Sequence, residues 1–214
     1  MQLQSAIVPP PEVFAAALAA AHSVRVAASQ VSEEPRGGLF QRLSRRATTQ
    51  APPPETSLSV VPSDHGFVRL TRFGNVSVDD TETLGIALGV AAWDWPAPVV
   101  HVSGLVLDTE PATPVVTAEL GGDVEGLRTI FRKVLEVAQT QRFFLDRRIF
   151  HPRFPVATVI TAHDPTIRER LAMESVVPAE LQWQVTHFSL LSMLFGSGSG
   201  AFEEIAVVPL GAAG

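Results

Sequence analysis

The sequence contains no cysteine. This absence excludes a disulfide framework, a zinc–thiolate site and a thiol nucleophile. The sequence also lacks an apolar run long enough to cross a bilayer, and its first residues lack the basic and apolar regions of a signal peptide. From these absences we expect a cytoplasmic protein that does not associate with membranes.

Charged residues are few as well. They make up 18% of the 214 residues, against 46% hydrophobic residues, and this balance is typical of a folded globule. The formal net charge is −6, so the protein as a whole does not attract nucleic acid. The acidic residues form no metal-ligand cluster, and the GGD and SGSG segments lack the context of a phosphate loop. We therefore expect neither a metal nor a cofactor.

One stretch, FVRLTRFGNV from Phe67 to Val76, organises the rest of the chain. Its alternation predicts a strand with two different faces, one of which carries Phe67, Arg69, Thr71 and Phe73. A second stretch, FHPRFPVATVI from Phe150 to Ile160, is its predicted counterpart in the other half of the chain. We expect the two strands to form the floor of one cleft.

The remaining pattern predicts strands and helices in a repeating order. Further strands are predicted over Gln2–Val8, Val99–Asp108, Pro114–Leu120, Leu181–Met193 and Ala201–Leu210, and helices over Glu12–Ala21, Asp80–Ala92 (capped by Asp79 or Asp80), from Asp123 to Ala138, and over Thr166–Met173. Strand–helix–strand units occur twice in similar order. We therefore predict an α+β fold, a single domain over residues 1–214 of two pseudo-symmetric lobes. Each lobe would be an antiparallel sheet with helices, around a central cleft.

The segment from Ser32 to Pro54 has a different composition. It is rich in Pro, Gly, Ser and Arg and has few core residues, which predicts a partly mobile excursion from the fold. Within it, Arg36 to Arg46 contains a short basic amphipathic turn. Two interpretations stay open: a solvated loop, or a docking segment for an acidic protein partner or RNA.

Read in order, these stretches resemble the 2H phosphoesterase superfamily, specifically its 2'-5' RNA ligase and cyclic phosphodiesterase type. The resemblance is carried by MQLQSAIVPPPEV, VVPSDHGFVRLTRFGNV, FHPRFPVAT and WQVTHFSLLSMLFGSGSGAFEEIAVVPL, and it covers nearly the whole chain except Ser32 to Pro54. It implies two His-x-Thr/Ser motifs on facing strands. In such a pair, one histidine acts as general base and the other as general acid on a phosphodiester.

Both motifs are missing at the positions where the resemblance places them. The first falls on Phe67-Val68-Arg69 and the second on Arg153-Phe154-Pro155, so neither offers an imidazole or a hydroxyl. The resemblance therefore implies a protein that has lost catalysis and acts as a nucleotide- or RNA-binding module or a protein-interaction module. The candidate phosphate-binding residues are Arg69 and Arg153, and the candidate cleft residues are Phe67, Thr71 and Pro155.

Two alternatives concern these same strands. Arg69 and Arg153 are equally expected to pair with acidic side chains such as Asp64 or Asp146. In addition, His65 and His151 each precede a lost catalytic position by two residues, which keeps them on the same strand face. They are the fallback catalytic residues of a 2',3'-cyclic or 2'-5' phosphodiesterase that uses displaced histidines.

Two other tripeptides match His-x-Ser, namely His101-Val102-Ser103 and His187-Phe188-Ser189. When their strands are superposed as repeats, His101 meets Gln184 instead of His187. We interpret both as strand histidines with local hydrogen bonds. A third functional possibility is a structural subunit that uses the arginine-rich segment or the terminal hairpin as its interface.

Overall fold

The computed structural model describes residues 1–31, 58–61, 65–109, 111, 113–143, 145, 149–159, 168–169, 171, 181–193 and 201–211, with side chains described up to Val24 in the first helix. The excursion predicted from Ser32 to Pro54, with its Arg36 to Arg46 segment, lies outside these residues.

The helices and strands follow one another in nearly the predicted order. They are β1 (Gln2–Ile7), α1 (Pro11–Val31), β2 (Leu58–Val60), β3 (Val68–Asn75), α2 (Val78–Ala91) with a 3₁₀ turn (Ala92–Asp94), β4 (Val99–Asp108), β5 (Val115–Gly122), α3 (Val124–Thr140), β6 (Arg153–Val159), β7 (Gln182–Gln184), β8 (His187–Met193) and β9 (Phe202–Pro209). In the predicted helix from Thr166 to Met173, the described residues Arg168, Glu169 and Leu171 are helical.

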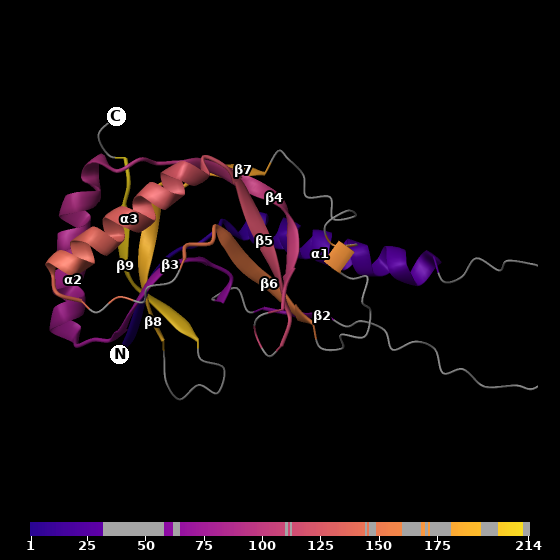
Figure 1. Cartoon of the computed structure of the whole chain (residues 1–214), viewed down its shortest axis with the longest axis horizontal. Coiled ribbons are helices and arrows are strands. Elements are labelled where there is room, and N and C mark those ends of the chain that lie inside the picture. Colours follow the sequence, from indigo (N-terminus) through magenta and orange to yellow (C-terminus); the bar gives the residue numbers. More distant parts are fainter. Residues whose placement is uncertain are drawn as a thin grey trace, which may run out of the picture.

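The strands form two antiparallel sheets. Sheet A has the order β3-β1-β8-β9 and sheet B the order β2-β6-β5-β4-β7. Helices α2 and α3 contact sheet A and each other, whereas α1 packs against β4 and β6 of sheet B (Figure 1). This arrangement confirms the predicted α+β fold of two lobes.

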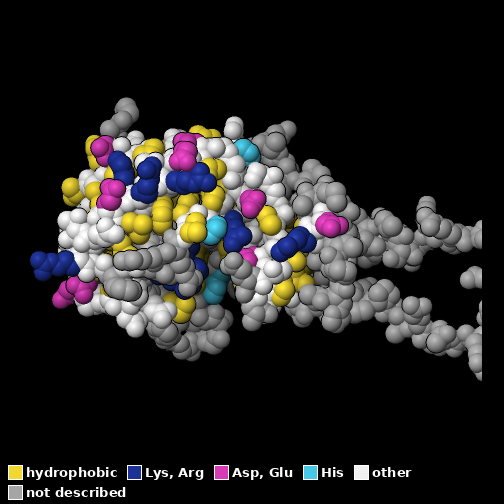
Figure 2. Space-filling view, viewed as in Figure 1, with side chains coloured by type: hydrophobic (Ala, Val, Ile, Leu, Met, Phe, Trp, Pro, Cys, Tyr) yellow, Lys and Arg dark blue, Asp and Glu magenta, His cyan; other side chains and the backbone are white. Residues whose placement is uncertain are grey.

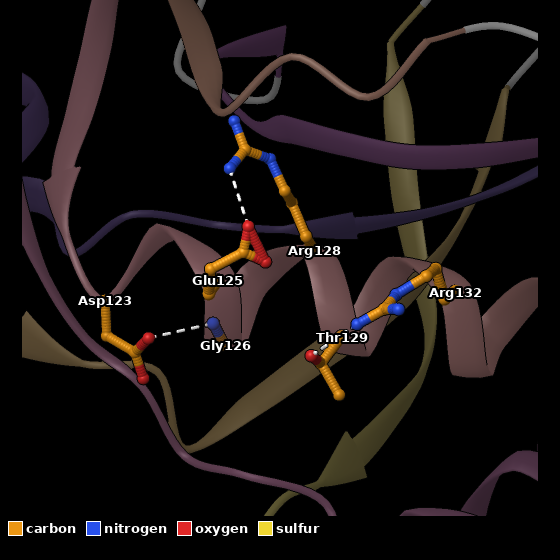
Figure 3. A network of polar contacts seen from close by, with 6 residues as sticks. All are labelled: Asp123, Glu125, Gly126, Arg128, Thr129 and Arg132. Atoms are coloured by element: carbon orange, nitrogen blue, oxygen red, sulfur yellow. Dashed lines mark hydrogen bonds and ion pairs between the residues drawn. The ribbon is translucent and has the colours of Figure 1, made fainter.

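Helix α3 shows why the sequence forms this architecture. Leu127, Ile130 and Val134 recur at helical spacing, and each is fully buried. Asp123 caps the helix, because its Oδ1 accepts from the backbone N–H of Gly126 at 2.8 Å (Figure 3). Glu125, Arg128 and Arg132, whose polar contacts Figure 3 shows, are exposed, so α3 has one buried and one exposed face.

The packing of the two lobes relies on aromatic pairs that join distant segments. Phe154 of β6 stacks on Phe14 of α1 with ring centroids 6.3 Å apart, and Trp95 stacks on Phe188 of β8 at 6.0 Å. Phe154 and Phe188 are both fully buried. Strands β6 and β8 are therefore each anchored to a segment that precedes them in the chain.

The structure corrects the predicted cap of α2. The cap is Ser77, not Asp79 or Asp80: Ser77 has an extended backbone, and its hydroxyl oxygen accepts from the N–H of Asp80 at 3.1 Å. The two aspartates instead lie in the first turn, where the helix dipole favours negative charge. The α1 helix also continues beyond the predicted Ala21 to Val31.

The predicted strand from Leu181 to Met193 is wrong as a single element. It is two strands that belong to different sheets, β7 beside β4 in sheet B and β8 beside β1 in sheet A. The break falls at Val185, whose side chain is buried and whose N–H donates to the carbonyl of Pro98 at 2.8 Å. This segment therefore links the two lobes. None of the described helices is both long and apolar enough to span a membrane.

Candidate functional site

A cavity of about 740 Å³ lies where β3 of sheet A faces β6 of sheet B. Its lining comprises His65, Phe67, Arg69, Leu70, Thr71, Arg72, Asp108, Pro111, Val115, Thr117, Phe131, Ile149, His151, Arg153 and Pro155. Every residue that the sequence suggested for the cleft is in this set. Histidine and Lys or Arg side chains lie close together near the middle of the face shown in Figure 2.

The position where the resemblance places the first imidazole is filled by a packed phenylalanine ring. Phe67 is only 4% exposed and forms a small apolar cluster with Ala6, Leu191 and Phe202. Its ring meets the ring of Phe202 edge to face, with centroids 5.2 Å apart. A carbon ring cannot accept or donate a proton, so this position contributes packing and no acid–base chemistry.

Two arginines reach the cavity from β3 because the strand pairing is irregular. Arg69 lies opposite Ala6 and Arg72 lies opposite Gln4 on β1, with a register shift between them. Since Ala6 and Gln4 are two residues apart on β1, they share one face, and the arginines opposite them share it too. Both arginines are exposed and line the cavity.

This irregularity corrects the simple alternation predicted for the strand. That pattern placed Arg72 on the face opposite Arg69, and it placed Phe73 on the same face as Arg69. In the structure, Phe73 is 4% exposed in the main core and its ring meets Phe143 at 5.8 Å. Periodicity alone cannot show an extra residue in a strand, so Arg72 was missed as a cleft residue.

The side chain of Arg69 is positioned by its neighbours on sheet A. Its Nε donates to Oε1 of Gln4 at 3.2 Å, and Gln4 is only 4% exposed. Its guanidinium carbon also lies 5.9 Å from the centroid of the Phe67 ring. Gln4 and Phe67 are therefore two of the neighbours that orient this arginine, which stands at the lost hydroxyl position.

Arg153, at the second lost position, has a different environment. Its Nη2 donates to Oδ2 of Asp108 at 2.8 Å, and these side chains are 26% and 16% exposed. The alternative that Arg153 pairs with an acidic residue is therefore correct, although the partner is Asp108. Asp64 and Asp146 lie outside the described residues. Asp108 was missed because 45 residues separate it from Arg153.

The two fallback histidines both line the cavity. His65 packs edge to face on Phe202, with ring centroids 5.0 Å apart, and His151 is exposed just before β6. The hydroxyls nearby are buried: Thr71 is 4% exposed, and Oγ1 of Thr117 donates to a backbone carbonyl at 3.3 Å. The structure thus brings the histidines to one cavity but offers no solvent-exposed hydroxyl among these threonines.

The histidines of the two His-x-Ser tripeptides do not line this cavity. Ser103 donates to the carbonyl of Glu119 at 3.2 Å, and Ser189 donates to the Glu204 carboxylate at 2.6 Å. His187 lies 3.1 Å from the hydroxyl of Thr186, beside a separate cavity of about 320 Å³. These contacts agree with local hydrogen bonding. Within the described part of the chain, no group of three or more His, Asp or Glu could hold a metal ion.

Solved structures share the fold of this chain, whereas the comparisons with family models and curated proteins give no match. No family model and no curated protein matches the chain. Among solved structures, E. coli LigT in complex with NADP+ is 17% identical, with a TM-score of 0.61 over 98% of this chain and 97% of LigT. TT0787 of Thermus thermophilus is 19% identical, with a TM-score of 0.59 and full coverage of both chains (100% and 100%).

A further similar structure is Kluyveromyces marxianus Usb1, 12% identical, with a TM-score of 0.53 over 98% of this chain and 97% of that one. E. coli LigT has also been solved with 3'-AMP, phosphate and ATP. These proteins share one fold with the present chain along almost its entire length. The chain therefore has the two-lobed fold of E. coli LigT, and this agrees with the α+β fold predicted from its sequence.

Proposed function

We propose that the protein binds a phosphate-bearing ligand, a nucleotide or an RNA end, in the cavity between the sheets and does not turn it over. The observation that carries this proposal is the local charge. Arg69, Arg72 and Arg153 line the cavity, and Asp108 is the only carboxylate among its described lining residues. The chain as a whole carries a net charge of −6. The described lining of the cavity is therefore positively charged in a protein that is negatively charged overall.

Guanidinium groups suit binding without catalysis. They donate several N–H groups in a planar fork that matches phosphate oxygens, and they stay protonated, so they do not act as bases. The cavity volume of about 740 Å³ is within the range of small-ligand sites. Its lining also offers apolar surface from Phe131, Ile149 and Pro155, against which a sugar or base can pack.

The residues at the positions of the two missing motifs also support binding without turnover. Phe67 and Pro155 occupy places where the resemblance implies an imidazole and a hydroxyl, and neither can move a proton. Nucleotides bound by a protein of the same fold, E. coli LigT, make adenine nucleotides reasonable first ligands. At this level of identity the similarity concerns the fold, so the ligand remains our proposal.

The proposal is tested by titration calorimetry with AMP, ATP and a short RNA that carries a 3'-phosphate. We expect saturable binding that weakens about tenfold in Arg69→Ala and in Arg72→Ala, because each removes a charge-assisted hydrogen-bond donor. The matched control is Arg128→Ala, whose side chain is 51% exposed on α3 and pairs with Glu125. Absence of saturable binding, or equal weakening by the control, would remove the proposal.

One observation favours a second candidate function. His65 and His151 line the same cavity, so a phosphodiesterase that uses displaced histidines is a defined alternative. Its test is hydrolysis of 2',3'-cyclic AMP. Activity that is lost in His65→Ala and His151→Ala, and kept in His101→Ala, would establish this alternative. A wild-type protein that leaves the cyclic nucleotide intact would exclude it.

A further inference from the structure

A second cavity, of about 320 Å³, lies where the chain passes between the two sheets. Residues 8–10 lead from β1 of sheet A to α1, which packs on sheet B, and residues 185–186 lead from β7 of sheet B to β8 of sheet A. Both segments line this cavity, and so does Glu204 of β9. Its described lining shares no residue with that of the cavity between β3 and β6, so the second cavity is a separate candidate site.

Glu204 reaches the second cavity because strand β9 is irregular. Strand β9 is the edge strand of sheet A, beside β8 (Figure 1). Across these strands, Val207 lies opposite Ser189 and Glu204 lies opposite Leu191, with a register shift between the two pairs. Since Ser189 and Leu191 are two residues apart on β8, they share one face of the sheet. Their partners share it too, although Val207 and Glu204 are three residues apart and would face opposite sides of a regular strand.

The carboxylate of Glu204 is held in place by a buried hydroxyl. Ser189 is fully buried, and its Oγ donates to Oε2 of Glu204 at 2.6 Å. Glu204 forms no ion pair with any residue that the structure describes. The described lining of the second cavity also contains no Lys or Arg. An oriented negative charge therefore lies at the wall of this cavity without a Lys or Arg beside it.

The rest of the wall suits the apolar part of a ligand. Trp183, Pro9 and Pro10 supply aromatic and aliphatic surface. A carboxylate and an aromatic ring together favour ammonium groups, because both attract positive charge. The volume of about 320 Å³ is at the lower end of the range for small-molecule sites. The second cavity therefore favours a small cation, whereas the arginines of the cavity between β3 and β6 favour anions.

We infer that the second cavity binds a small organic ammonium ion. Glu204 pairs with the ammonium group, and Trp183 packs against the apolar part of the ligand. This inference goes beyond the proposed function and is independent of it, because it concerns other residues and a ligand of opposite charge. A bound ion contacts both of the chain segments that line the cavity and pass between the sheets.

The experiment compares benzylammonium with benzyl alcohol, which has nearly the same size and no charge. Each is titrated into isotope-labelled protein, and NMR follows the backbone amide signals of Trp183 and Thr186. We expect benzylammonium to shift these signals saturably and benzyl alcohol to bind at least about tenfold more weakly, because hydrogen bonds between charged groups are the stronger ones. Glu204→Gln should weaken benzylammonium binding about tenfold and change benzyl alcohol binding less than about twofold.

The matched control is Glu203→Gln, which removes the same charge from the neighbouring residue of β9. Glu203 is exposed, lies opposite Ser192 and is not in the described lining of the cavity. This variant should change benzylammonium binding less than about twofold, because salt screens exposed charges. Glu204→Ser repeats the test if circular dichroism shows that Glu204→Gln has lost its fold.

Three results would overturn this inference. The first is a wild-type protein whose signals benzylammonium does not shift saturably. The second is equal affinity of the wild type for benzylammonium and benzyl alcohol. The third is a loss of benzylammonium binding in the Glu204 variants that is no larger than the loss in Glu203→Gln. Each result leaves phosphate binding in the other cavity untouched, so the proposed function stands or falls by its own test.

Discussion

The two walls of the cavity hold their arginines in opposite ways. On sheet A, Arg69 donates to the neutral amide of Gln4, and the irregular pairing of β3 brings Arg72 to the same face. On sheet B, Arg153 donates to the carboxylate of Asp108. The two lobes are similar in architecture, but these contacts of their arginines differ. Each contact comes from another strand of the same sheet, so the pairing of strands determines which residue each arginine meets.

The largest expected difference between the walls concerns packing. Phe154→Ala on β6 should lower the free energy of unfolding by about 3–5 kcal/mol, because it removes a fully buried ring that stacks on Phe14. Phe67→Ala on the other wall should cost less, since its cluster is small and borders the cavity. Urea unfolding of both variants measures the two losses. Equal losses would contradict this difference between the walls.

The second difference concerns the glycines near the ends of β3 and β5. Gly74 and Gly122 both have positive φ, at 77° and 85°. Gly74→Ala should cost about 1–2 kcal/mol from backbone strain alone, since nothing lies within 4 Å of the added carbon. Gly122→Ala should cost more, because its added carbon would lie 2.7 Å from the carbonyl oxygen of Val99. Thermal unfolding that ranks the two variants in reverse would refute this expectation.

The third difference concerns binding. Arg72→Ala should weaken AMP binding about tenfold, because it removes a charge-assisted hydrogen-bond donor. Arg153→Ala should weaken AMP binding at least as much, because it removes the cation that compensates Asp108 in the cavity and leaves that carboxylate to repel the ligand. Titration calorimetry measures both, with melting temperatures to confirm that each variant is folded. A smaller effect at Arg153 would show that Asp108 does not act on the bound ligand.

The smallest expected effect compares the ion pair of the cavity with one on the surface. A double-mutant cycle on Asp108 and Arg153 should give a coupling energy of about 1 kcal/mol, because the pair is partly buried and hydrogen-bonded. The same cycle on Glu125 and Arg128, whose side chains are 72% and 51% exposed, should give about 0.3–0.5 kcal/mol. Raising the salt concentration should reduce the coupling energy of the surface pair more than that of the cavity pair. Indistinguishable couplings would show that burial of the cavity pair contributes nothing.

Much of the fold could be predicted from the sequence because its strands and helices carry clear local signals. The alternating stretch around Phe67, the helical spacing from Leu127 to Val134 and the proline-bounded strands each reflect a pattern a few residues long. The resemblance added the order of the lobes, and the solved structures share that fold. The residues suggested for the cleft lie on or just before β3 and β6 and line the cavity, while their role in binding stays a prediction.

The features that escaped prediction depend on contacts between distant segments. The extra residue in β3 is defined only against β1, so no period within FVRLTRFGNV shows that Arg72 joins Arg69. The break at Val185 depends on a hydrogen bond from its N–H to the carbonyl of Pro98. It also depends on the separation of the two sheets, which the sequence of this stretch does not reveal. The partner of Arg153 likewise depends on where β4 ends. Local sequence patterns predict the strands and helices, whereas the pairing of distant strands determines which charged side chains meet in the site.

The position of β1 in sheet A has a consequence for biosynthesis. This strand lies between β3 and β8, which means that its second row of hydrogen bonds needs a segment near the opposite end of the described chain. A growing polypeptide that has emerged only as far as α3 still exposes one edge of β1, because residues 187–193 have not yet left the ribosome. Such non-local pairing slows folding and leaves an unpaired apolar strand in the meantime. We therefore expect the nascent chain to depend on chaperones until β8 has been synthesised.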